Sequence, residues 1–307
     1  MTTNIFSVLN TAKLGLLSQQ QAMEVTGQNI ANVQTEGYSR QEVEFEAISN
    51  RGVKVAGIKR FHDEFIYSQI LGESDSHGRY QVRKDVFEQL EQLLSENNGQ
   101  SLNGSLSSLF AGLQDVATNP TGLPERATLV AEAQILSSVF NNLGESLFQI
   151  QQNLDSSISV EVAKINSLAQ EIGALNKSIH ANESTTYNAN DLRDKRDQKV
   201  KELSQIIDLN VVSEQDGQIG LTLNDGTPLV LQSTVFTVAT STNGNNKSFF
   251  DVGFLDAAGK TKNVTSSITG GTIKGFLEMR DVEVEGLKDK LDRLAAGFIQ
   301  EFNEIHQ

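Results

Sequence analysis

Apolar residues near the start of the chain recur at alternating intervals of three and four residues. From Ile5 onward this series holds apolar or small residues except at Gln19 and Thr26. The mean period of 3.5 residues is that of a coiled-coil seam, narrower than the apolar stripe of a globular surface helix. We therefore predict an amphipathic helix whose apolar face contacts another helix in an assembly interface. The residues of this seam are Ile5, Leu9, Ala12, Leu16, Met23 and Ile30.

Directly after this helix the pattern changes to an alternation of period two. Residues 43–47 and 53–57 alternate in this way, and a turn-forming segment that ends at Gly52 separates them. This predicts a β-hairpin with one face covered. In the junction between helix and hairpin, Asn32 is suited to end the helix in a left-handed conformation, and Gly37 is suited to the positive φ of a type II turn.

The middle of the chain carries the longest helical pattern. Apolar residues from Leu136 to Ile179 follow one another at intervals of three or four without a gap, which predicts one helix from about 126 to 181. Shorter segments of the same kind, at residues 79–94, 102–116 and 190–207, are expected to pack with it.

After Asp208 the composition changes to short strands separated by Asp-Gly turns at 216–217 and 225–226. These strands predict a small antiparallel β domain, and from Gly270-Gly271 the helical spacing returns. The expected fold class is mainly α with an inserted β domain (α+β), built on a long helical bundle or coiled-coil core. Its segments are 1–70 (helix, junction and hairpin), 71–208 (helical bundle), 209–270 (β domain) and 271–307 (returning helix of the bundle, where the chain is expected to be truncated).

Composition narrows the choice of partners. The formal net charge of −14 would repel nucleic acid or an anionic membrane, so neither is expected as a partner. The absence of cysteine excludes disulfides and thiolate metal sites. The N-terminus has neither the basic region nor the apolar run of a cleaved signal peptide.

Catalytic chemistry finds little support in the residues. A metal-dependent hydrolase could be imagined around His62, Glu64 and His77, but the spacings of a zinc site are absent. The charged cluster Asp194, Arg196 and Asp197 is typical of a solvated helix face or of a local ion network that contributes little energy. We therefore expect no enzyme, and no catalytic, cofactor or metal residues.

The junction motif resembles that of the bacterial flagellar rod, hook and hook-associated protein family, although Glu36 stands where the family usually has Pro. Further matches at residues 52–60, 63–65, 190–197, 270–281 and 294–303 narrow the resemblance to the first of the two proteins that join hook to filament, along nearly the whole chain. The motif residues are Asn29, Asn32, Thr35, Gly37, Tyr38 and Arg40.

This resemblance implies a structural subunit that forms the hook-filament junction and is required for filament assembly. Its implied partners are copies of itself, the hook protein and the second junction protein, with an export chaperone binding the missing C-terminal part. It also implies secretion through the flagellar export apparatus, to a site outside the cell. From periodicity alone, a coiled-coil scaffold or adaptor of another surface assembly is the alternative. Because the seam lacks its partner in the isolated chain, we expect the first helix to be mobile there.

Overall fold

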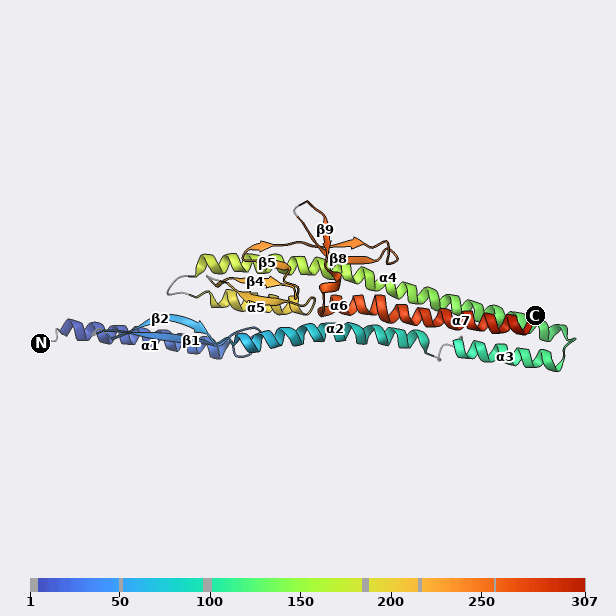
Figure 1. Ribbon diagram of the computed structural model, residues 1–307. Helices are drawn as coiled ribbons and strands as arrows, with labels where there is room; N and C mark the ends of the chain where they lie inside the picture. Colours follow the sequence, from blue (N-terminus) through green and yellow to red (C-terminus); the bar gives the residue numbers. More distant parts are fainter. Residues whose placement is uncertain are drawn as a thin grey trace. The chain divides into compact units, whose positions relative to one another are not determined.

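The computed structural model describes residues 5–49, 52–95, 101–183, 188–214, 217–256 and 258–306. Long helices dominate, and short antiparallel strands are inserted between them (Figure 1). The helices are α1 (Ile5–Ala31), α2 (Glu64–Leu94), α3 (Leu102–Thr118), α4 (Leu123–Asn182), α5 (Asn190–Ser204), α6 (Gly271–Glu278) and α7 (Val284–His306). The fold is therefore mainly α with inserted β structure, as predicted.

Within the part of the chain that the structure describes, the strands form three sheets. The first is the predicted hairpin of β1 (Gln41–Ile48) and β2 (Gly52–Arg60), with Gln41 opposite Arg60 at its base. The predicted β domain consists of two sheets. One contains β3 (Asn210–Ser213), β4 (Ile219–Thr222), β5 (Pro228–Leu231) and β6 (Thr234–Val235); the other contains β7 (Val238–Thr242), β8 (Phe250–Leu255) and β9 (Thr261–Asn263).

The chain divides into two compact units. Unit 1 comprises residues 1–77, 162–241 and 251–271, and unit 2 comprises residues 78–161, 242–250 and 272–307. Each unit combines stretches that are far apart in the sequence. The four consecutive segments expected from the sequence therefore remain a prediction.

Unit 2 is a helical bundle with an aliphatic core. Residues of α2, α4 and α7 meet in it at the spacings of three and four that the sequence shows, and partly buried Leu287 and Leu291 extend it along α7. Its buried members are Val82, Val86, Leu90, Leu147, Leu154, Met279 and Val284. The returning helix is interrupted here, because residues Met279–Glu283 form a π-helical turn between α6 and α7.

In unit 1 the sheets lie against the C-terminal part of α4, and three residues of that helix explain how. Asn166 exchanges hydrogen bonds with the backbone of Val238 on β7. Asn176 donates to the carbonyls of Ile219 and Gln232. At Gly173 an added Cβ would lie 2.9 Å from Val235, so this glycine lets β6 approach the helix.

Two helix boundaries differ from the sequence prediction. The helix expected from residue 79 begins earlier, at Glu64, where the Asp63 carboxylate accepts hydrogen bonds from the backbone N–H of Phe65 and Ile66. The helix expected over 190–207 ends at Ser204, and Ile206 and Ile207 beyond it are buried. At the first boundary a side-chain cap, which the apolar period does not report, sets the start of the helix.

Candidate assembly surface

The first helix presents two different faces. Helix α1 contacts both strands of the hairpin. Besides Val25, the less exposed face of the helix carries mostly small or polar residues: Thr11, Gly15, Ser18, Ala22 and Asn29. Of these, Ser18 and Val25 are buried, and the Ser18 hydroxyl donates to the carbonyl of Val53. The helix thus has a partner within its own chain, which the sequence prediction did not foresee.

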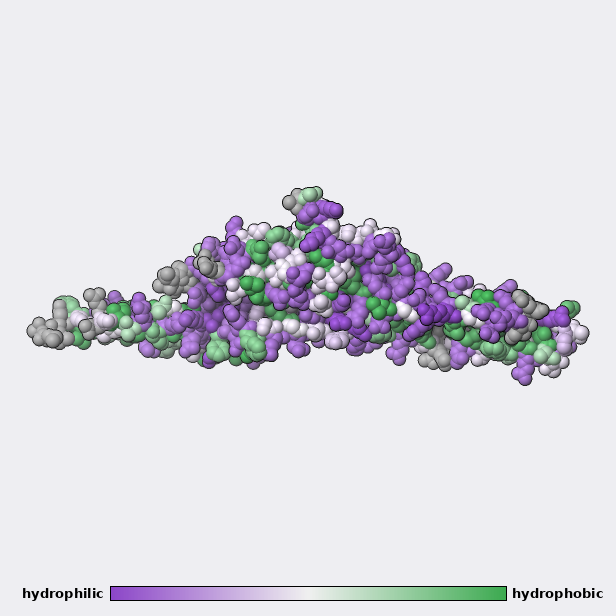
Figure 2. Space-filling model, in the orientation of Figure 1, coloured by the Kyte–Doolittle hydropathy of each residue, from purple (hydrophilic) through white to green (hydrophobic). Residues whose placement is uncertain are grey.

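The apolar seam lies on another side of α1. Since each residue advances about 100° about the helix axis, the seam is rotated by roughly 130° from the face toward the hairpin. Its large members are exposed: Leu16 by 70%, Met23 by 75% and Ile30 by 69%. Ile5, Leu9 and Ala12 are exposed as well. The space-filling view shows apolar side chains at the surface of this end of the chain (Figure 2). Val8 and Leu17 are also exposed on α1 but lie outside the predicted seam.

The junction after α1 is closed by the side chain of Asn29. Its amide oxygen accepts hydrogen bonds from the Gln41 backbone N–H at 2.9 Å and the Tyr38 hydroxyl at 2.8 Å, and its amide nitrogen donates to the Gln41 carbonyl. One residue therefore ties the end of the helix to the start of the first strand.

The turn within the junction is partly as predicted. Gly37 has a φ of +77° at the third position of the turn closed by the hydrogen bond from Tyr38 N–H to the Thr35 carbonyl, as a type II turn requires. The left-handed conformation predicted for Asn32 is wrong, since Asn32 does not have a positive φ. Its side chain instead donates to the Gln28 carbonyl and accepts a hydrogen bond from the Thr35 hydroxyl at 3.2 Å. Arg40, the last motif residue, stacks over the ring of Phe61.

The charged cluster on α5 is not a solvated face. Asp194 is 7% exposed and Arg196 is 2% exposed. The Asp194 carboxylate accepts hydrogen bonds from the Ser39 backbone N–H and from the Arg60 guanidinium, at 2.9 and 3.0 Å. Of the two alternatives, the solvated face is wrong and the ion network is present. Helix periodicity could not decide between them, because it gives the face on which a charge lies but not what covers that face.

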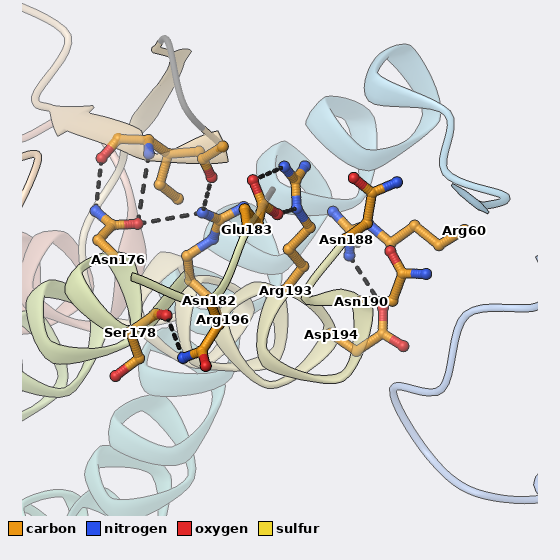
Figure 3. A network of polar contacts seen from close by, with 12 residues as sticks. Arg60, Asn176, Ser178, Asn182, Glu183, Asn188, Asn190, Arg193, Asp194 and Arg196 are labelled. Atoms are coloured by element: carbon orange, nitrogen blue, oxygen red, sulfur yellow. Dashed lines mark hydrogen bonds and ion pairs between the residues drawn. The ribbon is translucent and has the colours of Figure 1, made fainter. Parts of the chain in front are cut away.

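Arg196 points to the other side of α5. Its guanidinium donates to the Gly217 carbonyl at 2.7 Å and to the Asn176 side chain, and thereby joins α5 to α4 and the sheets (Figure 3). Burial lowers the pKa of Arg196, although the neighbouring Asp197 acts in the opposite direction. Nothing in the local sequence marks this residue as buried, and Asn176 appears there as an ordinary polar member of α4.

Comparison with known proteins identifies the family. The model of the flagellar hook-associated protein FlgK helical domain matches residues 87–307, which is most of the chain. The chain belongs to the FlgK family. A second model, that of the flagella basal body rod protein, matches residues 9–38 and thus covers most of α1 and the junction.

Relatives extend the match to nearly the whole chain. Flagellar hook-associated protein 1 of Bacillus subtilis is 28% identical over 99% of this chain, and that of Salmonella typhimurium is 29% identical over 98%. The chain spans 68% and 56% of their respective lengths. The flagellar hook junction protein FlgK of Burkholderia pseudomallei has a similar structure, with 26% identity and a TM-score of 0.62 over 69% of this chain and 39% of that one.

His62, one of the residues considered for metal chemistry, has other contacts in this FlgK-family chain. His62 lies 3.8 Å from the Asp197 carboxylate and packs against the ring of Tyr67. Within the described ranges, no group of three or more His, Asp and Glu side chains is placed to hold a metal ion. Among the described helices, none combines the length and apolar character needed to cross a bilayer.

Proposed function

We propose that this protein is a structural subunit of the bacterial flagellum that forms the junction between hook and filament and is required for filament assembly. Membership of the FlgK family and the names of its relatives support this role. The observation that carries it is the exposed seam on α1. An apolar stripe along an amphipathic helix is the usual form of a helix-helix interface.

In this role the seam residues Ile5, Leu9, Ala12, Leu16, Met23 and Ile30 contact another helix of the assembly. The small residues of the opposite face hold α1 on the hairpin, but they bury little apolar area. The helix is therefore weakly held in the free chain and is stabilised when a neighbouring subunit covers the seam. Contacts of this kind, repeated head to tail, generate tubular assemblies.

The proposed partners are copies of this protein, the hook protein and the second junction protein. The proposed location is the flagellum outside the cell, reached through the flagellar export apparatus. A dedicated export chaperone is proposed as a further partner.

Gene deletion in a flagellated host tests the role. We expect intact hooks without filaments and flagellin released into the medium, whereas normal swimming of the deletion strain would reject the proposal. Complementation with Leu16→Glu tests the seam. A charge at this exposed position leaves the monomer folded but prevents burial against a partner helix, so filaments should not form.

The matched control is Gln21→Glu, which places the same charge at an exposed position of α1 away from the seam. This variant should restore swimming. Equal complementation by both variants would show that the seam is not an assembly interface.

A further inference from the structure

The N-terminal arm, defined as residues 5–60, is joined to the rest of unit 1 in an unusual way. It comprises α1, the junction and the hairpin, and it continues into α2 through residues 61–63. Among the aliphatic and aromatic side chains of its described residues, Val25 alone is buried, and Val25 lies on the α1 face that contacts the hairpin. A shared apolar core therefore does not set the position of the arm on unit 1.

Polar contacts to α5, in place of an apolar core, set the position of the arm. The Gln198 side chain donates to the Glu36 carbonyl at 2.7 Å. The side chain of Asn190 donates to the carbonyl of Ile58 at 2.9 Å, and Asn188, just before the helix, does so at 3.1 Å. These bonds end on backbone carbonyls of the arm, so they are neutral and individually modest.

Asp194 occupies the central position among these contacts. One of its carboxylate oxygens accepts the Ser39 backbone N–H just before β1, and the other accepts the Arg60 guanidinium at the end of β2. Ser39 and Arg60 lie at the base of the hairpin, where Gln41 pairs with Arg60. A single carboxylate on α5 thus holds both strands of the hairpin at its base, where β1 begins and β2 ends.

Arg60 strengthens this contact with a second ion pair. Its guanidinium also lies 2.7 Å from the Asp197 carboxylate, and the side chains of Arg60 and Asp194 are each only 9% exposed. Figure 3 shows Arg60 directed at Asp194 on α5. A polar cavity of about 760 Å³, lined in part by Arg60, Asn190 and Asp197, adjoins the pair. The arm therefore rests on charge-assisted hydrogen bonds beside a polar cavity, where geometry matters more than buried area.

We propose that Asp194 and Arg60 form a latch that fixes the direction of the N-terminal arm, and that Asp194 is the positioning residue of the assembly helix. When the latch is broken, the arm stays folded on its own hairpin contacts but pivots about residues 61–63. That this matters for junction formation rests on the proposed function. The latch itself is a property of the free chain and can be tested without assembly.

The test measures the direction of the arm in the full chain. Because the chain has no cysteine, spin labels can be placed at Ala47→Cys on β1 of the arm and Lys201→Cys on α5, both exposed positions, so that the distance does not depend on how firmly α1 is held. Double electron-electron resonance spectroscopy then gives the distribution of distances between the two labels. Removing one partner of a buried ion pair typically shifts the equilibrium between the native arrangement and one without that pair by about a hundredfold or more. Asp194→Asn should therefore change a narrow distribution into a broad one, with unchanged helix content by circular dichroism.

The matched control is Glu202→Gln, which removes an exposed carboxylate of α5 whose ion pair is with Lys199 of the same helix. Its distance distribution should stay narrow. Arg60→Lys keeps the charge but loses the forked geometry, so its distribution should be intermediate. It also serves as the test variant if Asp194→Asn does not fold.

A narrow distribution in both Asp194→Asn and Arg60→Lys would overturn the latch. Broadening in Glu202→Gln equal to that in Asp194→Asn would also overturn it. These results are independent of the deletion phenotype, so failure of the latch and failure of the proposed function can be told apart. If both hold, Asp194→Asn should complement the deletion strain less well than Glu202→Gln.

Discussion

Replacement of Arg280 by Met is expected to destabilise unit 2 strongly. Arg280 lies in the π-helical turn before α7 and is fully buried. Its guanidinium lies 2.5 Å from the Asp155 carboxylate of α4, donates to the Phe250 carbonyl at 2.9 Å, and pairs with Asp281. Burial alone would lower the pKa of Arg280, but the hydrogen bonds and charges of Asp281 and Asp155 raise it overall. The arginine therefore stays charged in the interior.

The magnitude follows from what remains after the substitution. Removing one partner of a buried ion pair costs about 3–5 kcal/mol, because the other charge stays buried without compensation. The side chain of Asp281 is 31% exposed and can be rehydrated, and Asp155 keeps its hydrogen bond from the Phe250 N–H at 2.8 Å. Both effects place the loss near the lower limit, about 3 kcal/mol. For a unit of this size such a loss lowers Tm by roughly 10 °C.

Differential scanning calorimetry of the full chain measures this loss. The control is Lys290→Met, which removes an exposed positive charge from α7 and should shift Tm little. The double variant with Asp155→Asn should lose less stability than the sum of the two single variants, since the charge left unpaired by Arg280→Met is then absent. A Tm for Arg280→Met equal to that of Lys290→Met would refute the reasoning.

Two further predictions concern unit 1. Gly271 has a φ of +76°, and an added Cβ would lie 2.3 Å from the backbone carbonyl of Ile206. Gly271→Ala should therefore lower the free energy of unfolding, measured by chemical denaturation, by about 3 kcal/mol or more. The control is Gly286→Ala, which adds a methyl group in open space on α7 and should not destabilise the protein. Burial first, and the charge of Arg60 second, lower the pKa of His62 below its ordinary value of 6.5. The folded state then binds the His62 proton less readily than the unfolded state. The free energy of unfolding is therefore unaffected by this group above pH 6.5 and decreases as the pH falls below 6.5. Between pH 6.5 and 5 the parent should lose more stability than His62→Gln, and equal slopes would contradict this assignment.

The long elements could be predicted from the sequence because one physical signal determines them. The apolar residues of α4 recur at three and four over the whole helix, and the members that face the bundle core, such as Leu147 and Leu154, are buried as the pattern requires. The hairpin followed in the same way from its period of two. Where another signal competes, the prediction failed. At Asn32 the side chain bonds back to the helix, and this removes the reason for a left-handed residue.

The polar site could not be predicted, because it is formed by residues about 150 positions apart. Ser39 and Arg60 meet Asp194 only in the folded chain, and no periodicity links a junction to a helix so far downstream. The resemblance supplied both motifs, residues 29–41 and 190–197, without the contact between them. This contact explains the α5 motif physically, since its carboxylates and amides satisfy backbone groups where the arm joins the rest of unit 1.

The two faces of α1 support the proposal that this helix contacts a neighbouring subunit. If this helix served only to stabilise the monomer, its large apolar side chains would face the hairpin, since burying each of them is worth about 1.5–3 kcal/mol. The hairpin instead receives Thr11, Gly15 and Ser18, while Leu16 and Met23 face solvent. This arrangement gives up stability in the free chain, and an exposed apolar stripe is characteristic of an interaction surface. The polar latch is consistent with it, because a helix that must be offered to a neighbouring subunit needs a fixed direction without being buried in its own unit.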